Sequence, residues 1–246
     1  MRNIFPRWTN TLPLKVIVGL GLIGAGVSAG INYYATPKYT RVGYQPTQPV
    51  SYDHSFHVGE LGLDCRYCHH GVDKSAHAGV PSANICMSCH KTVKANSPAL
   101  EPIRNSFYGE DKNKDGILSK GEDVDNNGIL SQGPPVPWTR IHKVPDYAYF
   151  NHAIHVNRGV SCVDCHGRID QMKEVSHAKH LSMAFCLDCH RNPEDSLRPL
   201  DKVTDLSWLP TSINSNDSAA IQAHAGLNLK EKWGIHPPVS CTGCHR

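Results

Sequence analysis

One long uncharged stretch stands near the start of the chain, and shorter apolar groups broken by polar, glycine and proline residues fill the rest. Val16 to Pro37 contains no charged residue. About 20 such residues, at the 1.5 Å rise of an α-helix, cross the hydrocarbon layer of a membrane. The pattern predicts a transmembrane helix over residues 16–36. More basic residues precede the stretch than follow it, which favours a cytoplasmic N-terminus.

The glycines in this stretch allow a second interpretation, because Gly19, Gly21 and Gly24 spell the G-x-G-x-x-G turn of dinucleotide-binding folds. That fold also needs an acidic residue about 20 positions further on. The first carboxylate is Asp53, and a proline-broken linker precedes it. We therefore interpret the small residues as close-packing positions of a membrane helix. A signal peptide cleaved after Ala29 is the alternative.

Beyond the linker the pattern predicts little regular structure. Helices are expected over Ser82 to Thr92 and Ser182 to Arg191, and the polar tail from Thr204 to Gly226 is expected to be an irregular surface excursion. Hydrophobic residues make up 39% of the chain and aromatic residues 7%, with 17 prolines and 20 glycines. This composition supplies few large apolar side chains for one large core, so another component must fill the interior.

The cysteines indicate what that component is. All ten fall into five C-x-x-C-H motifs, and none is left over. This motif attaches c-type haem: two thiols bond the porphyrin edge, and the next histidine binds the iron. Disulfides, zinc sites and thioredoxin-like motifs do not require a histidine after every pair. The predicted haem-binding residues are Cys65, Cys68, His69, Cys86, Cys89, His90, Cys162, Cys165, His166, Cys186, Cys189, His190, Cys241, Cys244 and His245.

Other histidines are candidates for the second axial position of each iron. H-x-x-H pairs precede the first and third motifs, and each pair can place its two imidazoles on neighbouring haems. The pairs are His54 with His57 and His152 with His155. A metal site on a helix, or two surface histidines, is the alternative. His77 and His177 each lie nine positions before a motif, and Met183 could serve one iron instead.

These histidines reveal an internal repeat of two modules, each with one H-x-x-H pair and two haem motifs. The predicted organisation is a cytoplasmic N-terminus (1–15), the membrane helix (16–36), a linker (37–50), a first dihaem module (51–100), an insertion (101–136), a second dihaem module (137–200) and a C-terminal segment with the fifth haem (201–246). The predicted fold class is a multihaem cytochrome c, mostly irregular with short α-helices around five covalent haems, plus one N-terminal transmembrane helix.

The second module carries a more specific pattern, in which Pro137-Trp138-Thr139-Arg140-Ile141-His142 runs into Phe150-Asn151-His152. The chain resembles small cytochromes of the c3 and c7 type. With its anchor and this stretch, it resembles more closely the membrane-anchored pentahaem subunit of bacterial alternative complex III, a quinol:acceptor oxidoreductase. That resemblance implies His142 as a further distal ligand, beside the histidines of the two H-x-x-H pairs.

The resemblance also implies a role. The chain would be an electron carrier rather than an enzyme, sitting beside iron-sulphur and quinol-binding membrane subunits. It would pass electrons to a monohaem cytochrome c or a terminal oxidase, with its haem domain on the periplasmic side of the bacterial inner membrane. An anchored multihaem quinol dehydrogenase feeding a periplasmic reductase is the alternative. A haem enzyme such as a nitrite reductase is disfavoured, because all five motifs end in histidine.

The insertion contains a calcium-loop pattern of the form D-x-[DN]-x-[DN]-G-x5-E. Its predicted ligands are Asp111, Asn113, Asp115, Ile117 through its carbonyl, Ser119 and Glu122. A second loop starts at Asp123, but Pro134 stands at its twelfth position. An acidic solvated linker is the alternative.

Charge adds little. The formal net charge is +3, and ionised haem propionates would bring the loaded protein close to neutral. Nucleic-acid binding needs a concentrated basic face, so no nucleic-acid partner is predicted.

Overall fold

A computed structural model describes residues 6–36, 40–119, 121–210 and 218–245. The predicted N-terminal segment, linker and C-terminal segment fall partly in the gaps, and those parts lie outside the described residues. The chain forms two compact units, residues 1–42 and residues 43–246.

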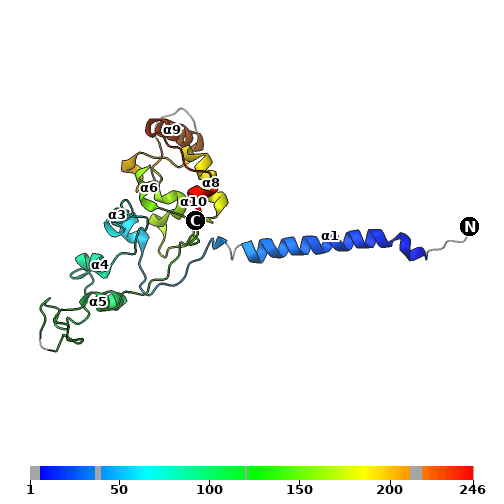
Figure 1. Ribbon diagram of the computed structural model, residues 1–246. Helices are drawn as coiled ribbons and strands as arrows, with labels where there is room; N and C mark the ends of the chain where they lie inside the picture. The colour runs from blue at the N-terminus through cyan, green and yellow to red at the C-terminus, as the bar shows by residue number, and fades with distance from the viewer. Residues whose placement is uncertain (1–5, 37–39, 120, 211–217, 246) are drawn as a thin grey trace, which may run out of the picture. The chain divides into compact units, whose positions relative to one another are not determined.

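The N-terminal unit is helical (Figure 1). A 3₁₀ turn η1 (Arg7–Asn10) leads into helix α1 (Leu12–Gly30), and a π-helical turn η2 (Ile31–Ala35) continues it. The apolar span Leu12–Ala35 covers 24 residues, roughly 36 Å of helix. No residue of α1 is buried. The helix starts four residues before the predicted position 16, because Pro13 is tolerated in a first turn, where no backbone donor is needed. This span is a candidate membrane anchor.

The larger unit consists of short helices joined by irregular segments (Figure 1). Its described residues contain no sheet, only isolated bridges between Ala148 and His245 and between Val160 and Leu197. The helical elements are η3 (Ser55–Glu60), α3 (Cys65–Cys68), α4 (Ala83–His90), η4 (Pro98–Leu100), α5 (Glu101–Tyr108), α6 (His152–Asn157), α7 (Cys162–His166), η5 (Ile169–Gln171), α8 (Met183–Arg191), η6 (Pro193–Asp195), η7 (Leu200–Lys202), α9 (Ser218–Trp233) and α10 (Cys241–Cys244).

Both helices expected in this unit are confirmed, with bounds that lie within two residues of the predicted ones. Helix α8 begins after Ser182, whose hydroxyl accepts a hydrogen bond from the Phe185 amide at 3.5 Å. A serine in this position satisfies one of the amides that a helix start leaves without a partner. The predicted module bounds within this unit remain predictions.

The expectation of an irregular tail up to Gly226 is wrong for its last part, because α9 runs from Ser218 to Trp233. This helix packs against η6, beside α8 (Figure 1). Gly226 is buried at the contact, where a Cβ would collide with the Glu194 carbonyl. The Lys230 ammonium binds the Glu194 carboxylate at 2.7 Å. The tertiary contact therefore stabilises a helix that a polar composition did not indicate.

The apolar core is small, as the composition predicted. In the described part of the chain only eight hydrophobic side chains are buried, and the largest cluster is built around Val50, Met87 and Ile103. Helix α5 contributes Ile103 to this cluster and lies beside α4 (Figure 1). The start of the predicted insertion thus packs on the first module.

Candidate functional site

All five C-x-x-C-H motifs lie on short helices. Helices α3, α7 and α10 begin at the first cysteine, while α4 and α8 carry their motifs near the end. Polar residues cap the starts: Asp64 accepts a bond from the Arg66 amide at 2.8 Å, and Ser161 forms a capping box with Asp164. Two cysteines three positions apart lie on one side of a helix. All ten cysteines carry free thiols, so each pair can bond one porphyrin edge.

Three histidine pairs place their rings at nearly the same separation. Two imidazoles on opposite sides of one metal ion, with bonds of about 2 Å, have ring centres roughly 6.3 Å apart. In each pair one histidine belongs to an H-x-x-H motif and the other follows a cysteine pair. The pairs are His57 with His90 at 6.3 Å, His152 with His166 at 6.4 Å, and His155 with His190 at 6.2 Å. Each pair leaves room for one iron.

Five of these six histidines, all but His166, share a second feature with His69: a hydrogen bond from Nδ1 to a backbone carbonyl. A carbonyl only accepts, so Nδ1 carries the proton and Nε2 keeps the lone pair that binds a metal. The bonds join His57 to Asp53 at 2.8 Å, His69 to Gly79 at 2.9 Å, His90 to Val93 at 2.8 Å, His152 to Ala76 at 2.9 Å, His155 to Asn151 at 2.7 Å and His190 to Pro238 at 2.7 Å.

The two H-x-x-H pairs are held in the same way, which supports the internal repeat in three dimensions. The Tyr52 ring stacks on His57 at 4.5 Å and lies edge-on to His54 at 4.6 Å. Phe150 stands in the equivalent place in the second module, stacked on His155 at 4.8 Å and edge-on to His152 at 4.6 Å. The residue before each pair is Asp53 or Asn151, and its side chain caps the following turn.

Burial favours the neutral form of these imidazoles. It lowers the pKa of His54 to about 4, with the nearby His69 adding to the effect, and it lowers the pKa of His152 and His155. It lowers the pKa of His166 to about 3. Since only a neutral imidazole binds a metal, the rings are prepared for ligation at neutral pH.

The remaining predicted ligands lie in varied places. The His142 ring is 4.3 Å from His166 and 5.0 Å from His177. The first separation is too short for an iron between the rings, so His142 does not share an iron with His166. Its distal role elsewhere stays a prediction, as does that of His77. Met183 is 65% exposed, and His245 lies 5.7 Å from the Tyr147 ring.

Comparison with known proteins gives two matches to family models. The model for cytochrome c7 and related cytochrome c matches residues 50–114, and the model for cytochrome c552 matches residues 135–232. Together they contain four of the five haem motifs and both H-x-x-H pairs. The protein has the fold class of a multihaem cytochrome c.

Two relatives are similar to this cytochrome. The menaquinone reductase multiheme cytochrome c subunit of Nitratidesulfovibrio vulgaris is 25% identical over 224 residues, which cover 91% of this chain and 88% of the relative. Cytochrome c-552 of Desulfotalea psychrophila is 34% identical over 61 residues, or 22% of this chain and 12% of that protein.

The residues present in the cytochrome fit covalent haem c. Paired free thiols stand on short helices, three of the histidines that follow them face a second histidine, and five of the six rings in these pairs have a protonated Nδ1 that leaves Nε2 for iron. The small apolar core has the same explanation, because a covalent haem is a large apolar plate that supplies buried surface itself.

The predicted calcium loop folds back on itself through its carboxylates. Glu122 is 4% exposed and accepts hydrogen bonds from the amides of Lys112, Asn113 and Ser119 at 2.9–3.1 Å. Asp111 accepts from the Gly116 amide at 3.0 Å. Among the described residues, no three His, Cys, Asp or Glu side chains gather in a metal-binding arrangement. These carboxylates would therefore have to turn from the amides to bind an ion.

Glu110 is a functional residue of this region that the sequence pattern did not predict. The second loop lacks a glutamate at its twelfth position, and Glu110 takes that place. Its two oxygens accept from the Val124 amide at 2.9 Å and the Ser131 amide at 3.1 Å. Glu122 makes the equivalent bonds in the first loop. A signal was present, because both glutamates directly precede the first aspartate of a loop, 12 positions apart.

Proposed function

We propose that this cytochrome is the electron-carrying subunit of a membrane complex that exchanges electrons with the quinone pool. The observation that carries the proposal is the set of histidine pairs 6.2–6.4 Å apart, each linking an H-x-x-H motif to a haem motif. An iron held between two such rings has no open position for a substrate. Bound haem c supplies a one-electron iron couple, and the protein residues keep it closed to other chemistry.

Each group of residues has a defined part in this role. The cysteine pairs hold the porphyrin edge, and the following histidines and the H-x-x-H histidines bind the two faces of the iron. Each H-x-x-H turn supplies rings to two sites, so it also holds those sites together. We assign His54 to the site of His69, because the other histidine of this H-x-x-H turn already pairs with His90 and because His54 lies near His69. This assignment gives a distal ligand to four of the five sites.

The membrane and quinone parts rest on the candidate anchor and on the relatives. Helix α1 would tether the haem domain on the periplasmic side, where cytochromes c are assembled. Iron-sulphur and quinone-binding subunits would be its neighbours. Two directions of electron flow are supported: quinol oxidation towards a monohaem cytochrome c or oxidase, by the resemblance to alternative complex III, and menaquinone reduction, by the name of the relative that matches 91% of the chain.

Purification of the intact chain in mild detergent tests this function. We expect iron-sulphur and quinone-binding subunits to co-purify, and low-temperature electron paramagnetic resonance to show low-spin ferric haem. Rapid mixing of the oxidised complex with a menaquinol analogue, and of the reduced complex with the matching quinone, measures the direction of flow. An isolated protein whose haem is high-spin and open to added ligands would overturn the proposal.

We also propose that the first loop binds one structural calcium ion through the six ligands predicted above. The support is the loop's geometry: its twelfth-position glutamate accepts hydrogen bonds from the amides of the second, third and ninth positions. An absence of calcium binding by isothermal titration of the intact protein would overturn this second proposal.

A further inference from the structure

The contacts between the haem motifs indicate their order in space. The motifs are numbered along the chain as site 1 (Cys65–His69), site 2 (Cys86–His90), site 3 (Cys162–His166), site 4 (Cys186–His190) and site 5 (Cys241–His245).

Sites 1 and 3 meet directly at their first cysteines. The thiols of Cys65 and Cys162 lie close together, although the residues belong to different modules. Both thiols are free, and each is the attachment atom for one porphyrin. The two porphyrin edges bonded to these atoms must therefore also lie next to each other.

Two consecutive residues, Val203 and Thr204, form hydrogen bonds with both sides of this junction. The hydroxyl of Thr204 donates to Asp64 at 2.8 Å, and the Val203 carbonyl accepts from the Ser161 hydroxyl at 2.8 Å. Asp64 and Ser161 are the caps of α3 and α7, which begin at the two touching cysteines. The starts of both helices are thus tied to one segment of backbone.

The modules also dock on each other reciprocally. The segment after site 1 accepts bonds from α6, where the amides of His152 and Ala153 reach the carbonyls of Ala76 and Ser75 at 3.2 and 3.1 Å. The corresponding segment after site 3 reaches the first H-x-x-H turn, where the Ser55 amide donates to the Met172 carbonyl at 3.1 Å. Each module therefore supports the histidine pair of the other.

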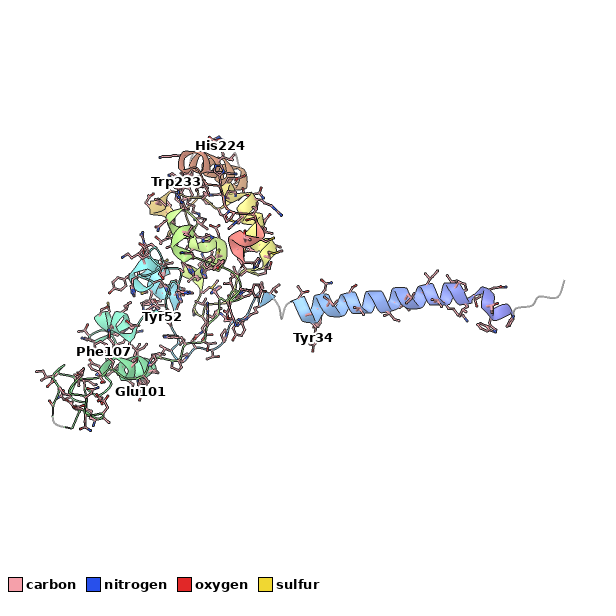
Figure 2. All side chains as sticks on the ribbon, in the orientation of Figure 1. Tyr34, Tyr52, Glu101, Phe107, His224 and Trp233 are labelled. Carbon is pink, nitrogen blue, oxygen red and sulfur yellow. The ribbon has the colours of Figure 1, made fainter. Side chains whose placement is uncertain are left out.

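Sites 1 and 2 have contacts of their own. The hydroxyls of Tyr67 and Ser88, which lie inside motifs 1 and 2, are 2.9 Å apart. The Tyr52 hydroxyl lies close to both Cys68 and Cys86, and Tyr52 is labelled in Figure 2.

Short contacts also join sites 3, 4 and 5. The Cys165 thiol lies close to Cys186 and Cys189, and Cys186 lies close to Cys244. The His190 ring donates to the Pro238 carbonyl, in the segment that leads to site 5, at 2.7 Å.

We propose that the five haem sites form one unbranched file in the order 2, 1, 3, 4, 5, and that Cys65 and Cys162 form the junction between the two modules. The file does not follow the chain, because its first two positions are reversed. Sites 2 and 5 are its ends. Transfer along it changes no bond: one iron goes from ferrous to ferric as the next goes from ferric to ferrous.

This inference rests on the proposed haem attachment and electron carriage, but not on the identity of any partner. It is tested on the purified holoprotein, by a redox titration followed by nuclear magnetic resonance that resolves the haems. Oxidation of one haem shifts the midpoint reduction potential of the adjacent haems more than that of distant haems. We expect large mutual shifts for site pairs 2 and 1, 1 and 3, 3 and 4, and 4 and 5. A larger shift between sites 2 and 3 than between sites 1 and 3 would overturn the order.

Removal of each end site gives an independent check. Cys241→Ala with Cys244→Ala removes attachment at site 5 and should shift the midpoint of site 4 alone. Cys86→Ala with Cys89→Ala should shift that of site 1 alone. If Cys86→Ala with Cys89→Ala shifted the midpoint reduction potential of site 3 more than that of site 1, the proposed order would be contradicted. If either variant fails to fold, the titration of the unmodified protein still decides. Loss of quinone-linked activity with the predicted shifts intact would contradict the proposed function only.

Discussion

Replacement of His155 by alanine should open one iron to external ligands. The His155 ring centre is 6.2 Å from that of His190, and its Nδ1 is fixed by the Asn151 carbonyl at 2.7 Å. Alanine removes the ring and keeps the helical backbone of α6. The iron at the site of His190 then has one protein ligand, and the other four sites keep theirs.

The size of the effect follows from the number of sites. One of five haem motifs is affected, so one fifth of the haem iron should change from low to high spin. The ferrous variant should bind one more carbon monoxide molecule per chain than the wild type, and added imidazole should restore the wild-type spectrum. Loss of the half-buried ring and its hydrogen bond should also reduce the free energy of unfolding by about 1–3 kcal/mol.

The assay combines low-temperature electron paramagnetic resonance with a carbon monoxide difference spectrum. His224→Ala is the matched control, because it removes an exposed histidine of α9 (Figure 2) that belongs to no pair. If His155→Ala kept the full low-spin signal and bound no carbon monoxide, or if the control changed as much, the ring separations would not report iron ligation.

Three further predictions concern the support of the haem domain. Gly226→Ala should reduce the free energy of unfolding by about 1–3 kcal/mol, because the added methyl collides with the Glu194 carbonyl; denaturant unfolding checks this, with exposed Asn228→Ala on the same helix as a control that should not destabilise. Glu122→Gln should abolish calcium binding by the first loop, while Glu110→Gln should retain it. Titration calorimetry of the two variants measures this, and equal loss of calcium binding in both would refute the assignment. The Arg66 hydrogen bond lowers the pKa of Asp64 from 3.8 to about 2. The difference in free energy of unfolding between wild type and Asp64→Asn should therefore be full above pH 3.8 and disappear as the pH falls to about 2. A difference that does not change with pH would contradict this.

Sequence patterns could predict those features that depend on neighbouring residues. A cysteine pair with its histidine, a serine before a helix and an uncharged run each carry their physical reason within a few positions. The helices α4 and α8 and the apolar helix at the N-terminus belong to this class. The fold class followed because the composition left too little apolar surface for a core without haem.

Features that depend on distant residues could not be predicted in this way. Helix α9 was missed because its polar composition does not indicate a helix, and the contact that stabilises it, between Lys230 and Glu194, joins residues 36 positions apart. The partner of each iron could not be assigned either. His142 follows a pattern typical of a ligand, yet its ring lies against His166 without room for a metal. Glu110 was missed because a linear loop pattern does not include residues outside the loop.

The reciprocal docking of the modules has a consequence for how the protein is made. The His152 ring donates to the Ala76 carbonyl, 76 residues earlier in the chain, at 2.9 Å. Contacts of such long sequence separation form late in folding. During synthesis, the first module is therefore made before the segment after site 3, which supports its histidine pair. The cysteines of the first module remain accessible during that time. Haem attachment at the first two sites can thus precede closure of the domain, and the second module completes both halves together.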